Sequence, residues 1–191
     1  MTAAVYLQAM GLSCSLGADE AAVRARLFAP AAPALPASDC WTPGRVLPLG
    51  RAAVEPPALA ADLPGALASR TNALVAQTLP ALRAAVDAAC ARFGPGRVAV
   101  VVGSSTAGVL EGEAAARHHQ AQGGWPAGYD YGQQEMASPA RFAARALGLA
   151  GPAYAISTAC SSGAKALASA ARLLRAGLAD AVVCGGADAL C

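Results

Sequence analysis

The feature that most constrains the fold is the stretch 153–190, AYAISTACSSGAKALASAARLLRAGLADAVVCGGADAL, in which two short apolar runs flank a helical pattern. Residues 154–157 are apolar and partly β-branched and follow a Gly-Pro pair, which is typical of a strand. Residues 181–184 form the second apolar run, and a Gly-Gly pair closes it. Two strands joined by one helix through short loops predict a parallel crossover unit.

Between the two runs, the apolar residues fall at three- and four-residue spacing, as on one face of a helix. This helix is predicted to begin at Cys160 and to end at Gly177, with two arginines in its last turns that suit the helix dipole. The apolar face consists of Ala164, Leu167, Ala168, Ala171 and Leu174.

Cys160 lies where the first strand turns into the helix, so its sulfur is expected to meet the helix N-terminus. Unpaired N–H groups there favour a thiolate over a thiol, and they can stabilise an oxyanion on a thioester carbonyl that the sulfur attacks. Ser161, Ser162 and Gly163 are small enough for a bulky acyl group to approach. From the residues alone, a buried structural cysteine is an equally good interpretation.

The same stretch resembles the β-ketoacyl synthases, the condensing enzymes of fatty-acid and polyketide assembly. Residues 157–163, STACSSG, are similar to the nucleophile motif of that family. Residues 148–152, GLAGP, match the family's GL-x-GP run before the strand, and residues 185–188, GGAD, match its GG-x-D/E run after the next strand. Weaker similarity at residues 11–16 and 98–103 extends the resemblance over most of the chain.

The resemblance implies an α/β, thiolase-like fold, of which this chain is the N-terminal half. That half has a mixed sheet with helices on both faces and the nucleophile at a strand-to-helix turn. We expect residues 1–191 to form one N-terminal β-ketoacyl synthase domain, with a proline-rich loop insertion at about 29–67. The second half, which in the family carries two histidines, a lysine and a further oxyanion donor, is expected to be absent. The chain would then be a fragment or one half of a split enzyme, inactive without the other half.

The resemblance also implies a reaction and its partners. Cys160 would be the nucleophile that takes an acyl group from an acyl carrier protein, and its own backbone N–H would be one oxyanion donor. A carbanion from decarboxylated malonyl-carrier would attack the thioester and give a 3-ketoacyl product, in fatty-acid or polyketide biosynthesis. The implied partners are carrier proteins with acyl and malonyl thioesters, and a second subunit in a homodimer or a ketosynthase heterodimer. No cofactor and no metal are implied.

Three other functions fit parts of the sequence. A thiolase-type acyl-CoA condensing enzyme shares the fold and the cysteine, although its local motif is less similar to STACSSG. A non-catalytic partner subunit, such as the chain-length factors of polyketide systems, lacks the nucleophile, so Cys160 argues against it. A binding module with an incidental cysteine is the third alternative.

The composition argues against several other classes. Hydrophobic residues make up 55% of the chain and charged residues 14%, a globular balance, and no apolar run approaches the roughly 20 residues that span a bilayer. The net charge of +2 comes without a basic run, so nucleic acid is not expected as a partner. Six cysteines without a C-x-x-C pair or a Cys/His cluster favour neither a disulfide scaffold nor a metal site. No basic residue precedes the first apolar stretch, so we expect a reduced, cytoplasmic protein rather than a secreted one.

Elsewhere the pattern predicts further strands and helices and an irregular proline-rich loop. Pro80 lies inside the longest helical pattern and is expected to kink or break it near Leu79. Residues 98–102 are apolar throughout, which suits a strand buried on both faces. The expected strands are 5–12 and 98–102, with a short one around 46–49, and the expected helices are 18–28, 69–93, 111–122 and 138–147.

Three segments outside the Cys160 stretch are weaker candidates. Residues 103–108, GSSTAG, match neither the hydrolase nucleophile elbow nor the phosphate-binding loop, and are interpreted as a tight turn near the active site. His118 and His119 are predicted to lie on a solvated helix face, because adjacent side chains point about 100° apart and the family's catalytic histidines come from its other half. The aromatic loop 123–132 and the helix 138–147 are candidates for a dimer interface and an acyl pocket, with ordinary packing as the alternative.

Overall fold

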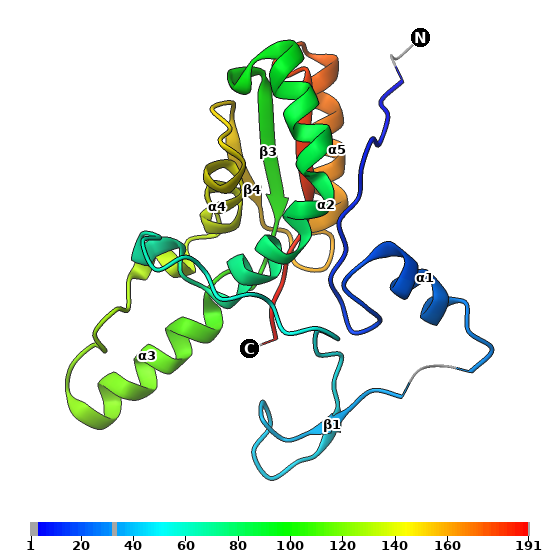
Figure 1. Cartoon of the computed structure of the whole chain (residues 1–191). Coiled ribbons are helices and arrows are strands. Elements are labelled where there is room, and N and C mark those ends of the chain that lie inside the picture. Colours follow the sequence, from blue (N-terminus) through cyan, green and yellow to red (C-terminus); the bar gives the residue numbers. More distant parts are fainter. Residues whose placement is uncertain (1–3, 32–33, 191) are drawn as a thin grey trace.

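A three-stranded parallel sheet forms the centre of the computed structural model, which describes residues 4–31 and 34–190. The strands are β4 (Ala153–Ile156), β3 (Val98–Gly103) and β5 (Ala181–Gly186), in that order across the sheet. Every residue of the middle strand β3 is buried, because helices cover both faces of the sheet (Figure 1). The predicted doubly buried strand and the predicted crossover from β4 to β5 are both confirmed.

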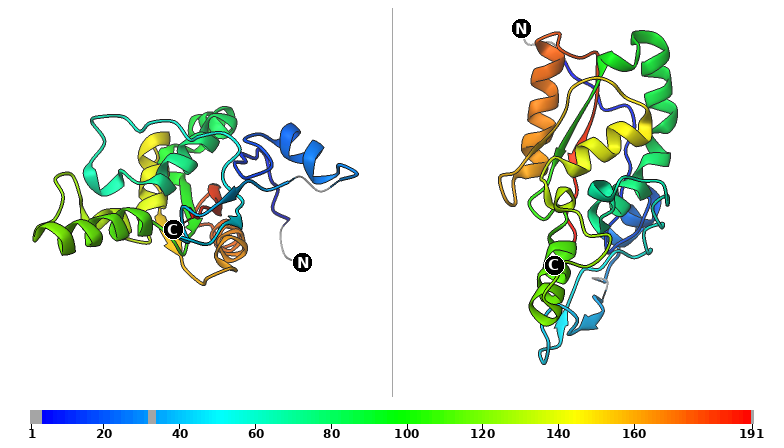
Figure 2. Two further views of the ribbon diagram at one scale, coloured as in Figure 1. Left: turned by 90° about the horizontal axis from the view of Figure 1, so that it is seen from below. Right: turned by 90° about the vertical axis from the view of Figure 1, so that its left-hand side faces the viewer.

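One face of the sheet packs against α5 (Ser162–Arg175), and the other packs against α2 (Arg70–Phe93) and α4 (Ser138–Leu147). The right-hand view of Figure 2 shows α5 on one side of the strands and α2 on the other. The hydrophobic core lies between the sheet, α2 and α4, and it is formed by Leu67, Val75, Leu79, Val86, Val100, Val102, Ala140, Phe142, Ala143, Ala144 and Leu147.

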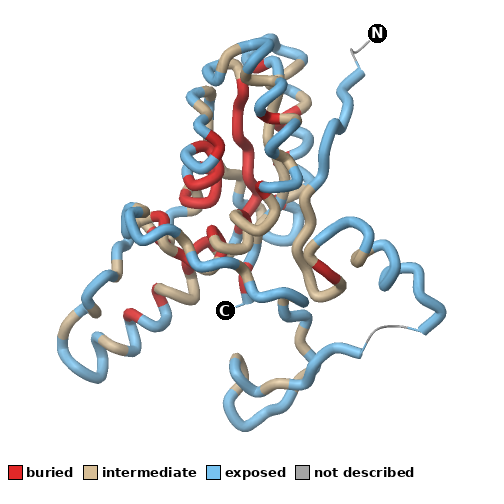
Figure 3. Tube along the Cα trace, viewed as in Figure 1, coloured by how far each residue is buried: buried red, intermediate tan, exposed pale blue. Residues whose placement is uncertain are grey.

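The remaining elements surround this core. The helix α3 (Val109–Gln122) projects away from the carboxyl end of β3, and α1 (Glu20–Leu27) lies on the opposite side (Figure 1). The proline-rich segment is mostly irregular and exposed in its described residues, as predicted (Figure 3). It includes the two-residue strands β1 (Ala37–Ser38) and β2 (Leu47–Pro48). Short 3-10 helices are η1 (Gly65–Leu67), η2 (Pro95–Arg97) and η3 (Tyr131–Gln134). In the part of the chain that the structure describes, no helix is both long enough and apolar enough to cross a bilayer.

The longest helix, α2, continues through Pro80, so of the kink or break expected near Leu79 the break does not occur. The Ser69 side chain caps its start by accepting the N–H of Asn72 at 3.2 Å. Buried side chains lie on both sides of the proline, Val75 and Leu79 before it and Val86 after it. These contacts with the core hold both parts of the helix in place although Pro80 lacks an N–H, and the axis of α2 bends along its length (Figure 1).

The N-terminal segment does not form the strand expected at residues 5–12, and this prediction is wrong. Its apolar side chains are largely exposed, with Tyr6 76% and Leu7 85% accessible. A strand needs a neighbour for its N–H and C=O groups, and none of the described strands pairs with this segment. It instead passes close to α2, where a Cβ on Gly11 would lie 2.4 Å from the Thr78 carbonyl oxygen.

The helix α5 buries a face other than its apolar one. Its buried residues are Ser162, Ala166, Ser169 and Ala170. The Ser169 hydroxyl lies 2.7 Å from the Tyr154 hydroxyl of β4, so a hydrogen bond offsets the burial of this polar group. In contrast, Leu167 is 46% exposed, and the apolar stripe that contains it points away from the sheet.

Candidate active site

Cys160 lies in the turn between β4 and α5, and its side chain is exposed. The structure therefore places it at a strand-to-helix turn, as the sequence predicts. The helix itself begins at Ser162 with Ser161 as its N-cap, so the prediction that it begins at Cys160 is wrong by two residues. The alternative of a buried structural cysteine is also wrong, because the side chain is accessible to a reactant.

The backbone of this turn is strained and held by two serine hydroxyls. Ala159 has a φ of +52° and is the one non-glycine residue in the left-handed region among the residues that the structure describes. The Ser162 Oγ accepts the N–H of Thr158 at 2.9 Å and donates to the carbonyl of Ala159 at 2.7 Å. The Ser161 hydroxyl donates to the carbonyl of Thr158 at 2.9 Å. These bonds fix the backbone on both sides of Cys160, so the thiol is carried by a well-defined turn.

Glycines bring the first turn of α5 into direct contact with the sheet. A Cβ added to Gly103 would lie 2.3 Å from the carbonyl carbon of Ser162, and one added to Gly186 would lie 3.2 Å from the Cα of Gly163. The close approach explains why small residues recur in the GSS, SSG and GGA triplets of the sequence. Sequence reasoning found each glycine separately but missed that all three meet at one point.

Two glycines of the GLAGP motif have separate structural roles. Gly148 ends α4 with a φ of +69°, a conformation that L-residues with a side chain rarely adopt. A Cβ on Gly151 would lie 2.4 Å from the carbonyl oxygen of Val98. The motif thus sets the approach of β4 to β3.

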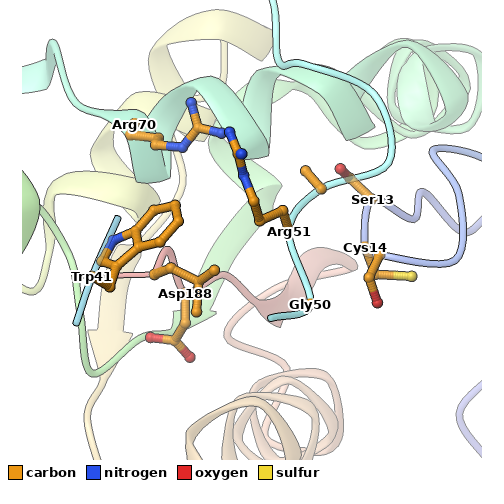
Figure 4. A pocket seen from close by; sticks show the side chains of 10 residues that line it. Ser13, Cys14, Trp41, Gly50, Arg51, Arg70 and Asp188 are labelled. Atoms are coloured by element: carbon orange, nitrogen blue, oxygen red, sulfur yellow. The ribbon is translucent and has the colours of Figure 1, made fainter. Parts of the chain in front are cut away.

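A cavity of about 220 Å³ lies beyond the carboxyl end of β5 (Figure 4). Its lining includes Arg51, Arg70 and Asp188. Arg70 forms an ion pair with Glu55, and its hydrogen bond lowers the pKa of that carboxyl. The Arg51 guanidinium lies 5.6 Å from the centre of the Trp41 ring. The wall therefore carries positive charge from the two arginines and negative charge from Asp188, a mixture that favours no single class of ligand.

The structure does not place the two histidines in the Cys160 turn. Both lie in the second half of α3, where the His118 Nδ1 is 2.9 Å from the Gly124 carbonyl oxygen. The exposed His119 ring stacks on Trp125 with a centroid separation of 4.6 Å. The solvated position is confirmed for His119, whereas His118 is half-buried.

The other candidates have ordinary structural positions. Trp125 of the aromatic loop is 58% exposed. The helix α4 packs into the core through residues such as Phe142 and Leu147, which is the packing alternative that the sequence left open. Cys184 lies half-buried in β5, and burial raises the pKa of its thiol.

Comparison with known proteins defines the class. The family model described as "Beta-ketoacyl synthase, N-terminal domain" matches residues 67–191, more than half of the chain. The structure of the ketosynthase ApeO in complex with its chain length factor ApeC, from Xenorhabdus doucetiae, contains a chain with 38% sequence identity and a TM-score of 0.87. The alignment covers 97% of this chain and 47% of that one. No curated protein matches the sequence.

The fold is thus that of a ketosynthase-type condensing-enzyme domain with thiolase-like architecture. The chain belongs to the β-ketoacyl synthase family and contains its N-terminal domain. It spans about half the length of the matching chain.

Proposed function

We propose that this domain provides the nucleophile of a β-ketoacyl synthase and that Cys160 accepts an acyl group from an acyl carrier protein. The observation that carries the proposal is an exposed thiol in the strand-to-helix turn that the STACSSG motif forms. In the proposed transfer, the Cys160 sulfur attacks the thioester carbonyl and a new carbon–sulfur bond forms. The bond to the carrier sulfur then breaks, and the carrier leaves as a thiol that carries the proton. The Cys160 backbone N–H is proposed as one donor to the oxyanion.

The second step of the proposed reaction is the condensation with malonyl-carrier to give a 3-ketoacyl-carrier. Family resemblance assigns the decarboxylation to two histidines and a lysine from the half of a ketosynthase that this chain does not match. We propose that this half packs over the exposed stripe of α5, where Leu167 is 46% and the following Leu178 59% accessible. Covering such a stripe would remove apolar surface from water.

The proposed partners are an acyl carrier protein and a second ketosynthase-type subunit. The matching ketosynthase was determined in complex with its chain length factor. By analogy, we propose that the protein containing this domain forms either a heterodimer of that kind or a homodimer, in fatty-acid or polyketide biosynthesis.

Acylation of the thiol can be tested with a small acyl thioester and mass spectrometry. We expect the wild-type chain to gain one acyl group on the peptide that contains Cys160, and the Cys160→Ala variant to gain none at that peptide. Cys40→Ala is the matched control, because Cys40 is also exposed but lies in the proline-rich segment. Equal acylation of the wild type and of Cys160→Ala would refute the nucleophile assignment.

A further inference from the structure

We propose that Asp188 is a positioning residue for Cys160, an inference that rests on the nucleophile role proposed above. Asp188 follows β5 and closes the GGAD motif. Its Oδ1 accepts the backbone N–H of Ser105 at 2.7 Å and that of Thr106 at 3.0 Å. The Thr106 hydroxyl donates to the same oxygen at 3.0 Å and accepts the N–H of Ala189 at 3.1 Å. One carboxylate oxygen therefore ties the loop after β3 to the end of β5.

This loop and the last residue of β3, directly before it, support the Cys160 turn from both sides. Upstream of Cys160, the N–H of Ser104 donates to the carbonyl of Ile156, the last residue of β4, at 3.1 Å. Downstream, Gly103 lies against the backbone of Ser162, the first residue of α5. The two backbone segments that flank the thiol thus rest on consecutive residues at the end of β3 and the start of the loop that Asp188 holds.

The contacts of Asp188 indicate that it acts on the loop rather than on the charged cavity. Asp188 lines that cavity together with Arg51 and Arg70, but no ion pair of the described residues joins it to either arginine. In Figure 4 its carboxylate points away from the two guanidinium groups. Among the residues that the structure describes, the hydrogen-bond donors to its carboxylate all lie in the segment 104–106.

Removing the Asp188 carboxylate should therefore displace the Cys160 thiol, although the thiol itself is still present. The N–H groups of Ser105 and Thr106 would donate to water instead, and the loop 104–106 would lose its hydrogen bonds to Asp188 at the end of β5. When both reactants are held by the protein, as in the proposed acyl transfer, a displacement of about 1 Å at the reacting atom can slow the reaction by up to about a hundredfold. We expect the reactivity of Cys160 to fall while the fold is retained.

The test compares alkylation rates at single cysteines in Asp188→Ala, Asp188→Asn and Asp188→Glu. Iodoacetamide forms a carbon–sulfur bond as iodide leaves and the thiol proton passes to solvent, and peptide mass spectrometry gives the rate at Cys160. The exposed Cys40 in the same sample is the internal reference. Asp180→Ala is the matched control, because Asp180 is a carboxylate at the opposite end of β5.

We expect Asp188→Ala to slow the alkylation of Cys160 at every pH of the series, while the rate at Cys40 is unchanged. Asp188→Glu, which restores a carboxylate, should recover part of the rate, and Asp180→Ala should change neither cysteine. Equal Cys160 rates in Asp188→Ala and Asp180→Ala would overturn the proposal. If Asp188→Ala does not fold, Asp188→Leu decides in the same way, because its side chain has a similar shape and no hydrogen-bond acceptor. Asp188→Asn keeps an Oδ1 that accepts hydrogen bonds and should retain more of the rate than either variant.

The same variants separate this inference from the proposed function. If an acyl thioester fails to label Cys160 in the wild type while Asp188→Ala still slows alkylation, the acyl-transfer role fails and the positioning role stands. If the wild type is acylated at Cys160 and Asp188→Ala is acylated equally fast, the positioning role fails and the acyl-transfer role stands.

Discussion

Gly103, the last residue of β3, lies backbone to backbone against Ser162, the first residue of α5. A Cβ on Gly103 would be 2.3 Å from the Ser162 carbonyl carbon and 2.5 Å from the amide nitrogen of Gly163. Both neighbouring atoms belong to the main chain, so no side chain can rotate to make room. Any added atom at this position must move the start of α5 and with it the turn that carries Cys160.

Gly103→Ala should therefore destabilise the domain and slow the reaction of Cys160. Overpacking a tight contact costs about 1–3 kcal/mol, so the free energy of unfolding in urea should fall by that amount. Gly185→Ala is the control in the same sheet, because a Cβ at Gly185 has no atom within 4 Å. The same loss of stability in both variants would contradict the close approach.

Ser162→Ala removes the hydroxyl that bridges the two ends of the Cys160 turn. Ser162 is 1% exposed, so the Thr158 N–H would be left without its partner in a poorly hydrated place. Leaving a buried donor unsatisfied costs about 1–3 kcal/mol, which urea unfolding can measure.

The exposed neighbour Ser161 provides the comparison for that experiment. Its hydroxyl bonds to the Thr158 carbonyl, which water can replace in Ser161→Ala. We expect a loss below about 1 kcal/mol for this variant. A larger effect for Ser161→Ala than for Ser162→Ala would show that the buried bridge does not hold the turn.

Ala159→Val tests the left-handed backbone at φ +52°. A β-branched residue is strongly disfavoured there, so we expect the free energy of unfolding to fall by about 1–3 kcal/mol. We also expect Cys160 to react more slowly. Ala159→Gly relieves about 1–2 kcal/mol of backbone strain in the folded state. It also raises the conformational entropy of the unfolded state, which costs about 0.4–1 kcal/mol of stability. The free energy of unfolding should therefore stay near that of the wild type. Equal losses in the valine and glycine variants, measured by thermal unfolding, would show that the backbone at this residue is not strained.

The order and type of the central elements could be predicted because they depend on local patterns. The apolar run of β3 and the strand–helix–strand pattern around Cys160 both appear in the structure with small shifts at their ends. The family motifs were equally local. The contact of Gly103 with Ser162 was not predictable in this way, because it joins residues that are far apart in the sequence.

The burial of α5 shows a second limit of the sequence pattern. The three- and four-residue spacing of Leu167 and its neighbours correctly indicated a helix, but Ser169 and Ala170 are buried instead. In an alanine-rich helix several faces are small enough to pack on a sheet, and the Tyr154–Ser169 hydrogen bond makes a polar face acceptable. Likewise, residues 5–12 were predicted to form a strand, but a local pattern does not show whether a partner strand is available.

The ion pair between Arg97 and Asp180 predicts how stability depends on pH. The Arg97 Nε donates to the Asp180 carboxylate at 2.7 Å, and this bond lowers the pKa of Asp180 below its ordinary value of 3.8. Because the unfolded chain keeps the ordinary pKa, the unfolded state binds the proton first as the pH falls.

The stabilisation from this ion pair is therefore complete above about pH 5 and is lost as the pH falls through the pKa of Asp180 in the folded state. In Asp180→Asn this contribution is absent, so the urea midpoint should fall less between about pH 6 and about pH 3 than in the wild type. Parallel pH profiles for the two proteins would show that the pair makes no pH-dependent contribution to stability.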